Sequence, residues 1–262
     1  MLKNKALFDD VAATKDSAFW WLGQHSFIVK LGESIVLIDP FLAEMEARNI
    51  PPLFTPEDAA SVQLVCCTHD HADHICPTAV SGLAKATTAT FVAPKACQER
   101  MLSLGVPAER LILLNPDEVA TVNDVRVTAI KAKHEFFDET PEGFFPYLGY
   151  VLEGANKTLY HAGDTVWWEG LQAKLSKWKF DAAFVPINGR DAKRYKENVI
   201  GNMTYQEAVD LVGELGVALS VPDHYDMFDG NREDPQKFVA YMNAKFPGRR
   251  VWVGEPTQRV VF

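Results

Sequence analysis

The sequence has few cysteines, and their spacing argues against two cysteine-based architectures. Four cysteines occur among 262 residues, and no two of them form a C-x-x-C pair. The pattern favours reduced thiols buried as small hydrophobic side chains over disulfides or a thiolate zinc module. Cys66 and Cys67 are adjacent, so they are predicted to face opposite sides of a strand, while Cys76 and Cys97 are expected in the core.

Basic residues are outnumbered by acidic ones. Lysine and arginine total 26 against 35 aspartates and glutamates, which leaves a net charge of −9. Nucleic acids and anionic membranes attract proteins with a positive field, so we expect no nucleic-acid partner and no membrane partner.

Long apolar runs and low-complexity segments are also missing. The N-terminal residues 1–5 lead into Asp9, Asp10 and Asp16 rather than into an apolar segment, so we expect a cytoplasmic protein. Hydrophobic residues make up 47% of the chain, enough for a sizeable core, and the polar stretch 188–202 is too short to separate two cores. We therefore expect a single domain over residues 1–262.

The most informative segment that is present is a His-x-His-x-Asp-His cluster. It supplies four potential metal ligands within six residues, namely His69, His71, Asp73 and His74. Imidazole and carboxylate suit zinc, manganese or iron, with iron the least favoured here. An apolar run of strand length precedes the cluster and Pro77 follows where a helix would begin, so the ligands are predicted on a strand-to-helix loop.

Periodicity predicts strands in both halves of the chain, with helices between and after them. Strands are expected over 19–22, 26–31, 34–38, 118–121, 125–132, 147–152, 158–161 and 182–187, with Gly32-Glu33 as a hairpin turn. Thr204 to Glu207 matches a capping box, and Asp234-Pro235 starts a second helix. The pattern is typical of two packed sheets covered by helices on both outer faces.

Further ligands are expected where other strands end. His134 follows the strand over 125–132, Asp164 follows the strand over 158–161, and His224 follows the apolar segment 219–223. Polar side chains at strand ends meet at one rim of a sandwich, so these three residues are the best candidates to complete the site.

This succession of ligands resembles the metallo-β-lactamase superfamily, a four-layer αββα sandwich. The resemblance implies that His69, His71 and His134 hold one divalent ion, that Asp73, His74 and His224 hold another, and that Asp164 bridges them. Segments such as Trp20 to Gly23, Tyr160 to Asp164 and Asn202 to Thr204 look like the L-ascorbate-6-phosphate lactonase group. His134 departs from that group, in which a carboxylate is expected, and the resemblance also implies a symmetric homo-oligomer.

The predicted chemistry is hydrolysis. One or two ions, zinc or manganese, would supply a metal-bound hydroxide and stabilise the oxyanion formed when it attacks a lactone carbonyl. Asp73 or a metal-bound water is the candidate to protonate the departing alkoxide. The resemblance puts His25 and His161 close to the site, with His25 as a candidate catalytic residue that acts by hydrogen bonding and a structural role open for His161. No Gly-x-Ser-x-Gly elbow supports a serine nucleophile.

A cationic stretch over 188–198 is the candidate substrate-binding loop. Guanidinium, ammonium and amide groups suit phosphate oxygens, and the candidates are Asn188, Arg190, Lys193 and Arg194, with a solvated surface loop as the equal alternative. The leading hypothesis is therefore a metal-dependent hydrolase of a small anionic metabolite, a sugar-phosphate lactone. A phosphodiesterase for RNA or a small or cyclic diester is the alternative. A redox diiron protein is disfavoured, because the resemblance would then require a glutamate where His71 stands.

Overall fold

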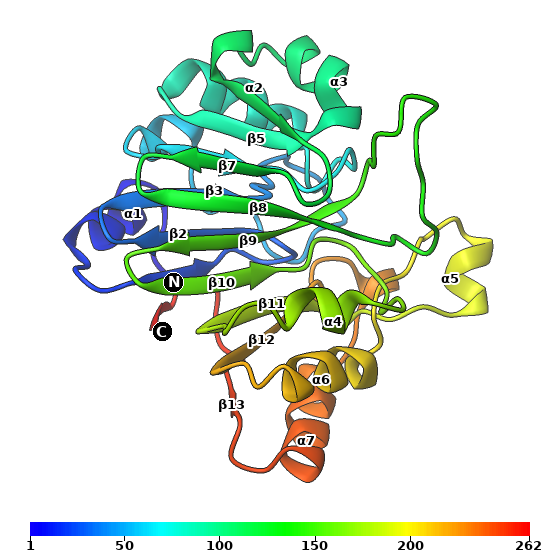
Figure 1. The fold of residues 1–262 in the computed structure, drawn as a ribbon. Coiled ribbons are helices and arrows are strands. Elements are labelled where there is room, and N and C mark those ends of the chain that lie inside the picture. The colour runs from blue at the N-terminus through cyan, green and yellow to red at the C-terminus, as the bar shows by residue number, and fades with distance from the viewer.

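The computed structural model describes residues 1–262 and contains two seven-stranded sheets (Figure 1). The first sheet has the order β14-β1-β2-β3-β4-β5-β6. Its strands are β1 (Ala18–Trp21), β2 (Phe27–Leu31), β3 (Ser34–Ile38), β4 (Leu64–Cys66), β5 (Thr90–Pro94), β6 (Leu111–Leu114) and β14 (Arg259–Val261).

The second sheet has the order β13-β12-β11-β10-β9-β8-β7. Its strands are β7 (Val119–Val122), β8 (Val125–Lys131), β9 (Leu148–Gly154), β10 (Lys157–His161), β11 (Ala182–Pro186), β12 (Leu219–Asp223) and β13 (Arg250–Val251).

Both sheets begin as an antiparallel meander and continue with parallel strands. In the first, β1, β2 and β3 are antiparallel and β3 to β6 are parallel. In the second, β7 to β10 are antiparallel and β10 to β13 are parallel. Leu31 pairs with Ser34, so Gly32-Glu33 forms the predicted two-residue turn, and Gly32 has the positive φ of 60° that such turns require.

Helices cover the outer face of each sheet, which confirms the predicted αββα sandwich. The helices are α1 (Asn4–Ala13), α2 (Pro77–Ala86), α3 (Gln98–Ser103), α4 (Leu171–Leu175), α5 (Ala192–Lys196), α6 (Tyr205–Glu214) and α7 (Pro235–Lys245), with short 3-10 turns η1 (Pro56–Ala59), η2 (Lys95–Cys97), η3 (Ala108–Arg110) and η4 (Asp229–Asn231). Residues of α1, α2 and α3 belong to a core cluster with the first sheet, and residues of α4, α6 and α7 belong to a cluster with the second sheet. In Figure 1, α2 and α3 lie at one end of the stack and α6 and α7 at the other.

Alternation along the strands explains why two cores form. Phe19 and Trp21 of β1 face the other sheet, whereas Trp20 faces the outer helices. Cys66 and Cys67 divide in the same way, as predicted, and all four cysteines are buried and free.

The helix termini follow their sequence signals. Thr204 accepts from the Glu207 amide, and the Glu207 carboxylate accepts from the Thr204 amide, which forms the predicted capping box of α6. Asp234 caps α7, and Pro77 opens α2. These residues fix where the preceding loops end and the helices begin.

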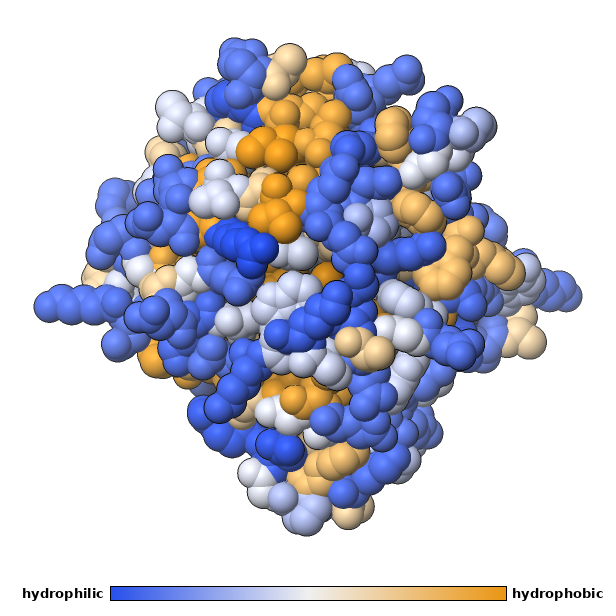
Figure 2. Space-filling model, viewed as in Figure 1, coloured by the Kyte–Doolittle hydropathy of each residue, from blue (hydrophilic) through white to orange (hydrophobic).

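The surface is mainly hydrophilic on the face shown in Figure 2, in keeping with the charged composition. Hydrophobic side chains that remain exposed include Phe136, Phe137 and Tyr195, of which Phe136 and the α5 residue Tyr195 line one cavity. None of the helices combines the length and the apolar character needed to cross a membrane.

Candidate metal centre

The candidate site lies where strands that run in the same direction end. In the first sheet β1, β3 and β4 share a direction, and in the second sheet β8, β10 and β12 share one. The predicted ligands follow β4, β8, β10 and β12, and the structure brings all seven together in two groups. Strand direction therefore gathers residues that are up to 155 positions apart in the chain (from 69 to 224).

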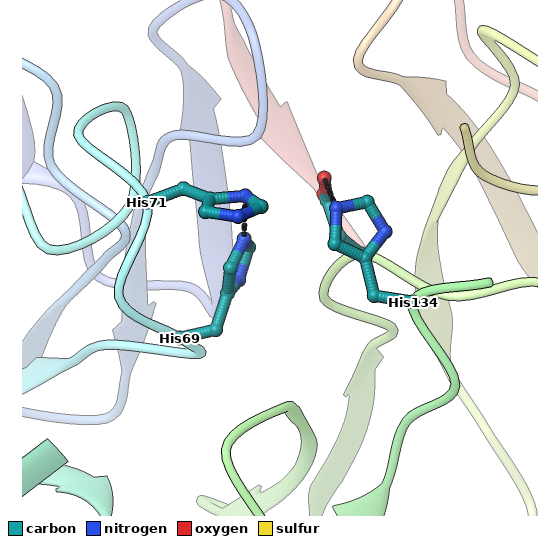
Figure 3. Close-up of side chains that lie close together, drawn as sticks. His69, His71 and His134 are labelled. Carbon is teal, nitrogen blue, oxygen red and sulfur yellow. Dashed lines mark hydrogen bonds and ion pairs between the residues drawn. The ribbon is translucent and has the colours of Figure 1, made fainter. Parts of the chain in front are cut away.

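The first group consists of His69, His71, His134 and Asp164, whose ligand atoms lie within 4.8 Å of one another. Nε2 of His69 lies 2.9 Å from Nδ1 of His71, and Nε2 of His134 lies 3.6 Å from an Asp164 oxygen. Figure 3 shows a nitrogen of His69 directed at a nitrogen of His71, with the two rings at 76° to each other and His134 entering from the opposite side. These nitrogens converge as ligands of one ion would.

The second group consists of Asp73, His74 and His224. Nε2 of His74 lies 3.5 Å from Oδ1 of Asp164, and Nε2 of His224 lies 3.3 Å from Oδ2 of Asp164. Because the Asp164 carboxylate is within 3.6 Å of histidines from both groups, it is placed to bridge two ions. A side chain at the preceding Gly163 would collide with the Leu148 carbonyl oxygen, so glycine is needed at this turn.

The donor set fits divalent ions. Three polar atoms are buried and have no hydrogen-bond partner: His74 Nε2, Asp164 Oδ1 and His134 Nδ1. The first two of them face each other between the ligand groups. Buried polar atoms without partners are costly, and an ion coordinated by His74 Nε2 and Asp164 Oδ1 would satisfy both. Imidazole and carboxylate are also the ligand types of zinc and manganese centres.

Electrostatics in the site favour positive charge at its centre. Burial alone would lower the pKa of His74, but the carboxylates of Asp164, Asp73 and Asp39 outweigh it and raise that pKa to about 10. The pKa of His134 is lowered to about 4, mainly by burial. The carboxylates thus hold a proton on one ligand in the metal-free protein, and a cation would take over that role.

Asp39 and Thr68 orient the ligand histidines, and sequence reasoning missed both. Asp39 accepts a hydrogen bond from Nδ1 of His74 at 2.8 Å, from the Thr68 amide at 2.8 Å and from the Thr68 hydroxyl at 2.6 Å. The Thr68 oxygen lies 3.0 Å from Nδ1 of His69. Both histidines therefore keep a proton on Nδ1 and direct Nε2 at the metal position, where an ion would displace the second proton that His74 carries in the metal-free protein. The available signal was a carboxylate, Asp39, directly after a strand.

His25 and His161 lie beneath the ligands rather than in the cavity. His25 is fully buried, and its Nδ1 lies 2.8 Å from an oxygen of Asp223, the residue before the ligand His224. Nε2 of His161 donates to the His25 carbonyl oxygen at 3.0 Å, and its Nδ1 accepts from the Gly163 amide at 3.3 Å. His161 is therefore fully hydrogen-bonded and holds the turn that carries Asp164, while His25 is placed to act only through Asp223.

The basic loop uses its cations within the protein. Arg190 forms a bidentate ion pair with Glu207, both contacts at 2.7 Å, and also donates to the Asn202 carbonyl oxygen. Arg194 pairs with Asp191 and donates to the Asn188 carbonyl oxygen.

Of the four residues expected to bind substrate, none lines the cavity that faces the ligands. Arg190 lines a neighbouring cavity, Lys193 is exposed, and Asn188 is buried behind Asn231. Arg190 and Arg194 hold the backbone of the loop and its contact with α6, whereas the Lys193 side chain is exposed, so substrate binding by this loop stays a prediction.

The ligand groups open onto a cavity of about 340 Å³. Besides five ligands, it is lined by three amide side chains and three apolar ones: Gln24, Asn198, Asn231, Val199, Ile200 and Phe228. Asn198 ends the stretch 188–198 predicted to bind substrate, and the other five were not predicted, since isolated amides and apolar residues carry no spacing signal. No lysine or arginine lines this cavity.

Comparisons with known proteins show the family of this chain. The family profile of the beta-lactamase superfamily domain matches residues 35–225. A UPF0173 metal-dependent hydrolase of Methanoculleus marisnigri is 30% identical over 222 residues, which cover 83% of this chain and 85% of that protein. A probable L-ascorbate-6-phosphate lactonase of Escherichia fergusonii is 26% identical over 211 residues, covering 72% of this chain and 56% of the lactonase. A metallo hydrolase of Ignicoccus hospitalis superimposes with a TM-score of 0.73 at 23% identity, covering 94% of this chain and 98% of that one.

Proposed function

We propose that the substrate of this protein is a small lactone. The premise is that this chain belongs to the beta-lactamase superfamily and is a metal-dependent hydrolase. The family membership also confirms the resemblance on which the fold prediction was based. The observation that carries the proposal is the placement of seven converging ligands at the base of a cavity of about 340 Å³. That volume is at the lower end of small-molecule sites, so it suits a metabolite about the size of a single sugar.

The lining favours a polar, uncharged ring over a polyanion. The Asn231 oxygen accepts hydrogen bonds from the Asn188 amide at 3.0 Å and from Arg194 at 2.9 Å, which leaves its NH₂ group to donate to a ligand. Val199, Ile200 and Phe228 supply apolar wall. Amide donors beside apolar surface suit the hydroxyl and carbonyl oxygens of a lactone ring.

The ligand residues define how hydrolysis would proceed. A pair of divalent ions, when bound, lowers the pKa of water and polarises a carbonyl oxygen. Asp73 lies at the cavity with its side chain 21% exposed, and its pKa is lowered because nearby His74 and His224 outweigh the effect of burial. It is therefore ionised at neutral pH, and we assign it the role of accepting a proton from the attacking water and returning it to the leaving alkoxide.

Phosphodiester hydrolysis is the second candidate, since the same ligands would serve it. A diester carries a negative charge that bound ions could neutralise, but the cavity has no lysine or arginine to hold the diester as well. A lactone needs no such group, although a phosphate elsewhere on the substrate could extend beyond the cavity. The likeness to a probable L-ascorbate-6-phosphate lactonase also supports a lactone over a phosphodiester as the substrate.

The test is hydrolysis by metal-stripped protein reloaded separately with manganese and with zinc. Substrates are sugar lactones with and without a phosphate, and a chromogenic phosphodiester. We expect metal-dependent lactone opening, its loss in Asp164→Asn, and full activity in Asp70→Asn, which removes an exposed aspartate from the loop that carries His69 and His71. Diester cleavage without lactone opening would overturn the substrate class, and activity that survives both metal removal and Asp164→Asn would overturn the centre.

A further inference from the structure

Gln24 is a buried residue with an unusual backbone at the edge of the metal centre. The residue is 2% exposed, and its φ is 53°, a left-handed value that is unfavourable for a residue other than glycine. Its carbonyl oxygen accepts hydrogen bonds from the His224 amide and from the Trp21 indole, each at 3.1 Å. The surrounding structure therefore imposes this conformation, which directs the side chain at the ligands.

The end of the Gln24 amide lies at the spacing of a metal ligand. It is 2.8 Å from Oδ2 of Asp73 and 3.2 Å from Nε2 of His224. The recognised ligand atoms of this group lie 3.3–3.9 Å from their neighbours. Donors that bind one ion at about 2.1 Å are separated by about 3.0–3.5 Å, so the amide is as close to these atoms as another ligand would be.

The hydrogen bond between Gln24 and His224 cannot persist once an ion binds at Nε2 of His224. The amide nitrogen of Gln24 now donates to Asp73 and lies 3.2 Å from Nε2 of His224, to which it donates when that ring carries its proton on Nδ1. Nε2 of His224 has a single lone pair, and coordination uses it. Rotation of the amide by 180° exchanges its nitrogen for its oxygen at nearly the same position.

We propose that the Gln24 amide oxygen is an additional ligand at the Asp73–His74–His224 position, where it favours manganese over zinc. The inference rests on the metal centre proposed above. The first position has three imidazoles and the shared Asp164, whereas the second would have two imidazoles, two carboxylates and an amide oxygen. Carbonyl and carboxylate oxygens suit manganese, and imidazole suits zinc, so the two positions differ in preference.

Two substitutions separate a ligand from a hydrogen-bond donor. Gln24→Glu keeps an oxygen that can coordinate but cannot donate to Asp73, whereas Gln24→Met keeps the length of the side chain and removes both functions. Gln236→Glu, on an exposed position of α7, adds the same charge elsewhere and serves as the control. Manganese and zinc bound per chain are measured by equilibrium dialysis with mass-spectrometric metal analysis, and affinities by calorimetry.

We expect wild type, Gln24→Glu and Gln236→Glu to bind two manganese ions, and Gln24→Met to lose at least tenfold in affinity for one of them, with a smaller loss for zinc. Loss of the second ion in Gln24→Glu would show that Gln24 serves only as a donor to Asp73, and full loading of folded Gln24→Met would exclude both roles. If Gln24→Met does not fold, the comparison of Gln24→Glu with wild type decides alone. A wild-type protein that binds no second ion would instead refute the dinuclear centre, and lactone hydrolysis tests the proposed reaction separately.

Discussion

Replacing Asp39 by asparagine should weaken metal binding although Asp39 does not face the ions. One carboxylate oxygen accepts from the Thr68 amide, and the other accepts from the Thr68 hydroxyl and from Nδ1 of His74. Asparagine keeps only one acceptor oxygen. Its NH₂ group would take the place of the second oxygen and face a donor at His74.

The magnitude follows from the tautomer of His74. To accept from the asparagine NH₂ group, Nδ1 must lose its proton, which moves to Nε2 and blocks the lone pair that points at Asp164 and Asp73. Loss of such an outer hydrogen bond typically costs 10- to 100-fold in metal affinity, or about 1.4–2.7 kcal/mol. Because the bonds to the buried carboxylate are charge-assisted, we also expect the metal-free protein to lose about 1.5–3 kcal/mol of unfolding free energy.

Calorimetric titration of metal-stripped protein with zinc and manganese measures the first effect, and urea unfolding measures the second. Asp70→Asn is the matched control, because it removes a carboxylate from the loop that carries the ligands His69 and His71, and the only ion pair of Asp70, to Arg100, is on the surface. We expect its affinities to match wild type and its stability to change by less than about 1 kcal/mol. If Asp39→Asn binds two ions as tightly as wild type, the bond to Asp39 does not set the tautomer of His74.

Other predictions follow from the same contacts. Burial lowers the pKa of His161 to about 3. Below about pH 6.5 the unfolded chain therefore takes up a proton at this histidine, whereas the folded protein does not. The free energy of unfolding consequently decreases as the pH falls from about 6.5 towards 3. Between pH 7.5 and 5, metal-free His161→Gln should therefore lose about 2 kcal/mol less than wild type in urea unfolding, and parallel pH profiles would contradict this. Arg190→Ala breaks the pair with Glu207, which is partly exposed and contributes at most about 1 kcal/mol to stability. Because Arg190 does not line the cavity at the ligands, KM should change equally for phosphorylated and neutral lactones. A selective rise in KM for the phosphorylated lactone would instead support direct phosphate binding by Arg190. All four thiols should resist a thiol reagent until the protein unfolds, because they are buried and the pKa of Cys97 is raised to about 12; a fast-reacting thiol in the native state would count against this.

Local signals in the sequence were sufficient for most secondary structure. The strand over 34–38 has the predicted bounds, and α6 and α7 begin at the predicted caps, because alternation, capping boxes and proline act within a few residues. The metal ligands could be predicted for a related reason. Four of the ligands lie within six residues of the chain. His134, Asp164 and His224 each follow a strand, so the position of these three at one rim of the sandwich depends only on strand direction.

The sequence by itself thus determined the sandwich and the seven candidate ligands, whereas the surroundings of those ligands were decided by tertiary structure. Asp39, Gln24 and Asn231 contact the site through partners 29 to 200 residues away, so no local pattern marks them. The basic loop shows the opposite case. Its composition indicated phosphate binding, but folding brought Glu207 to Arg190. The Arg190 guanidinium therefore uses its hydrogen bonds within the protein, with the Glu207 carboxylate and the Asn202 carbonyl oxygen.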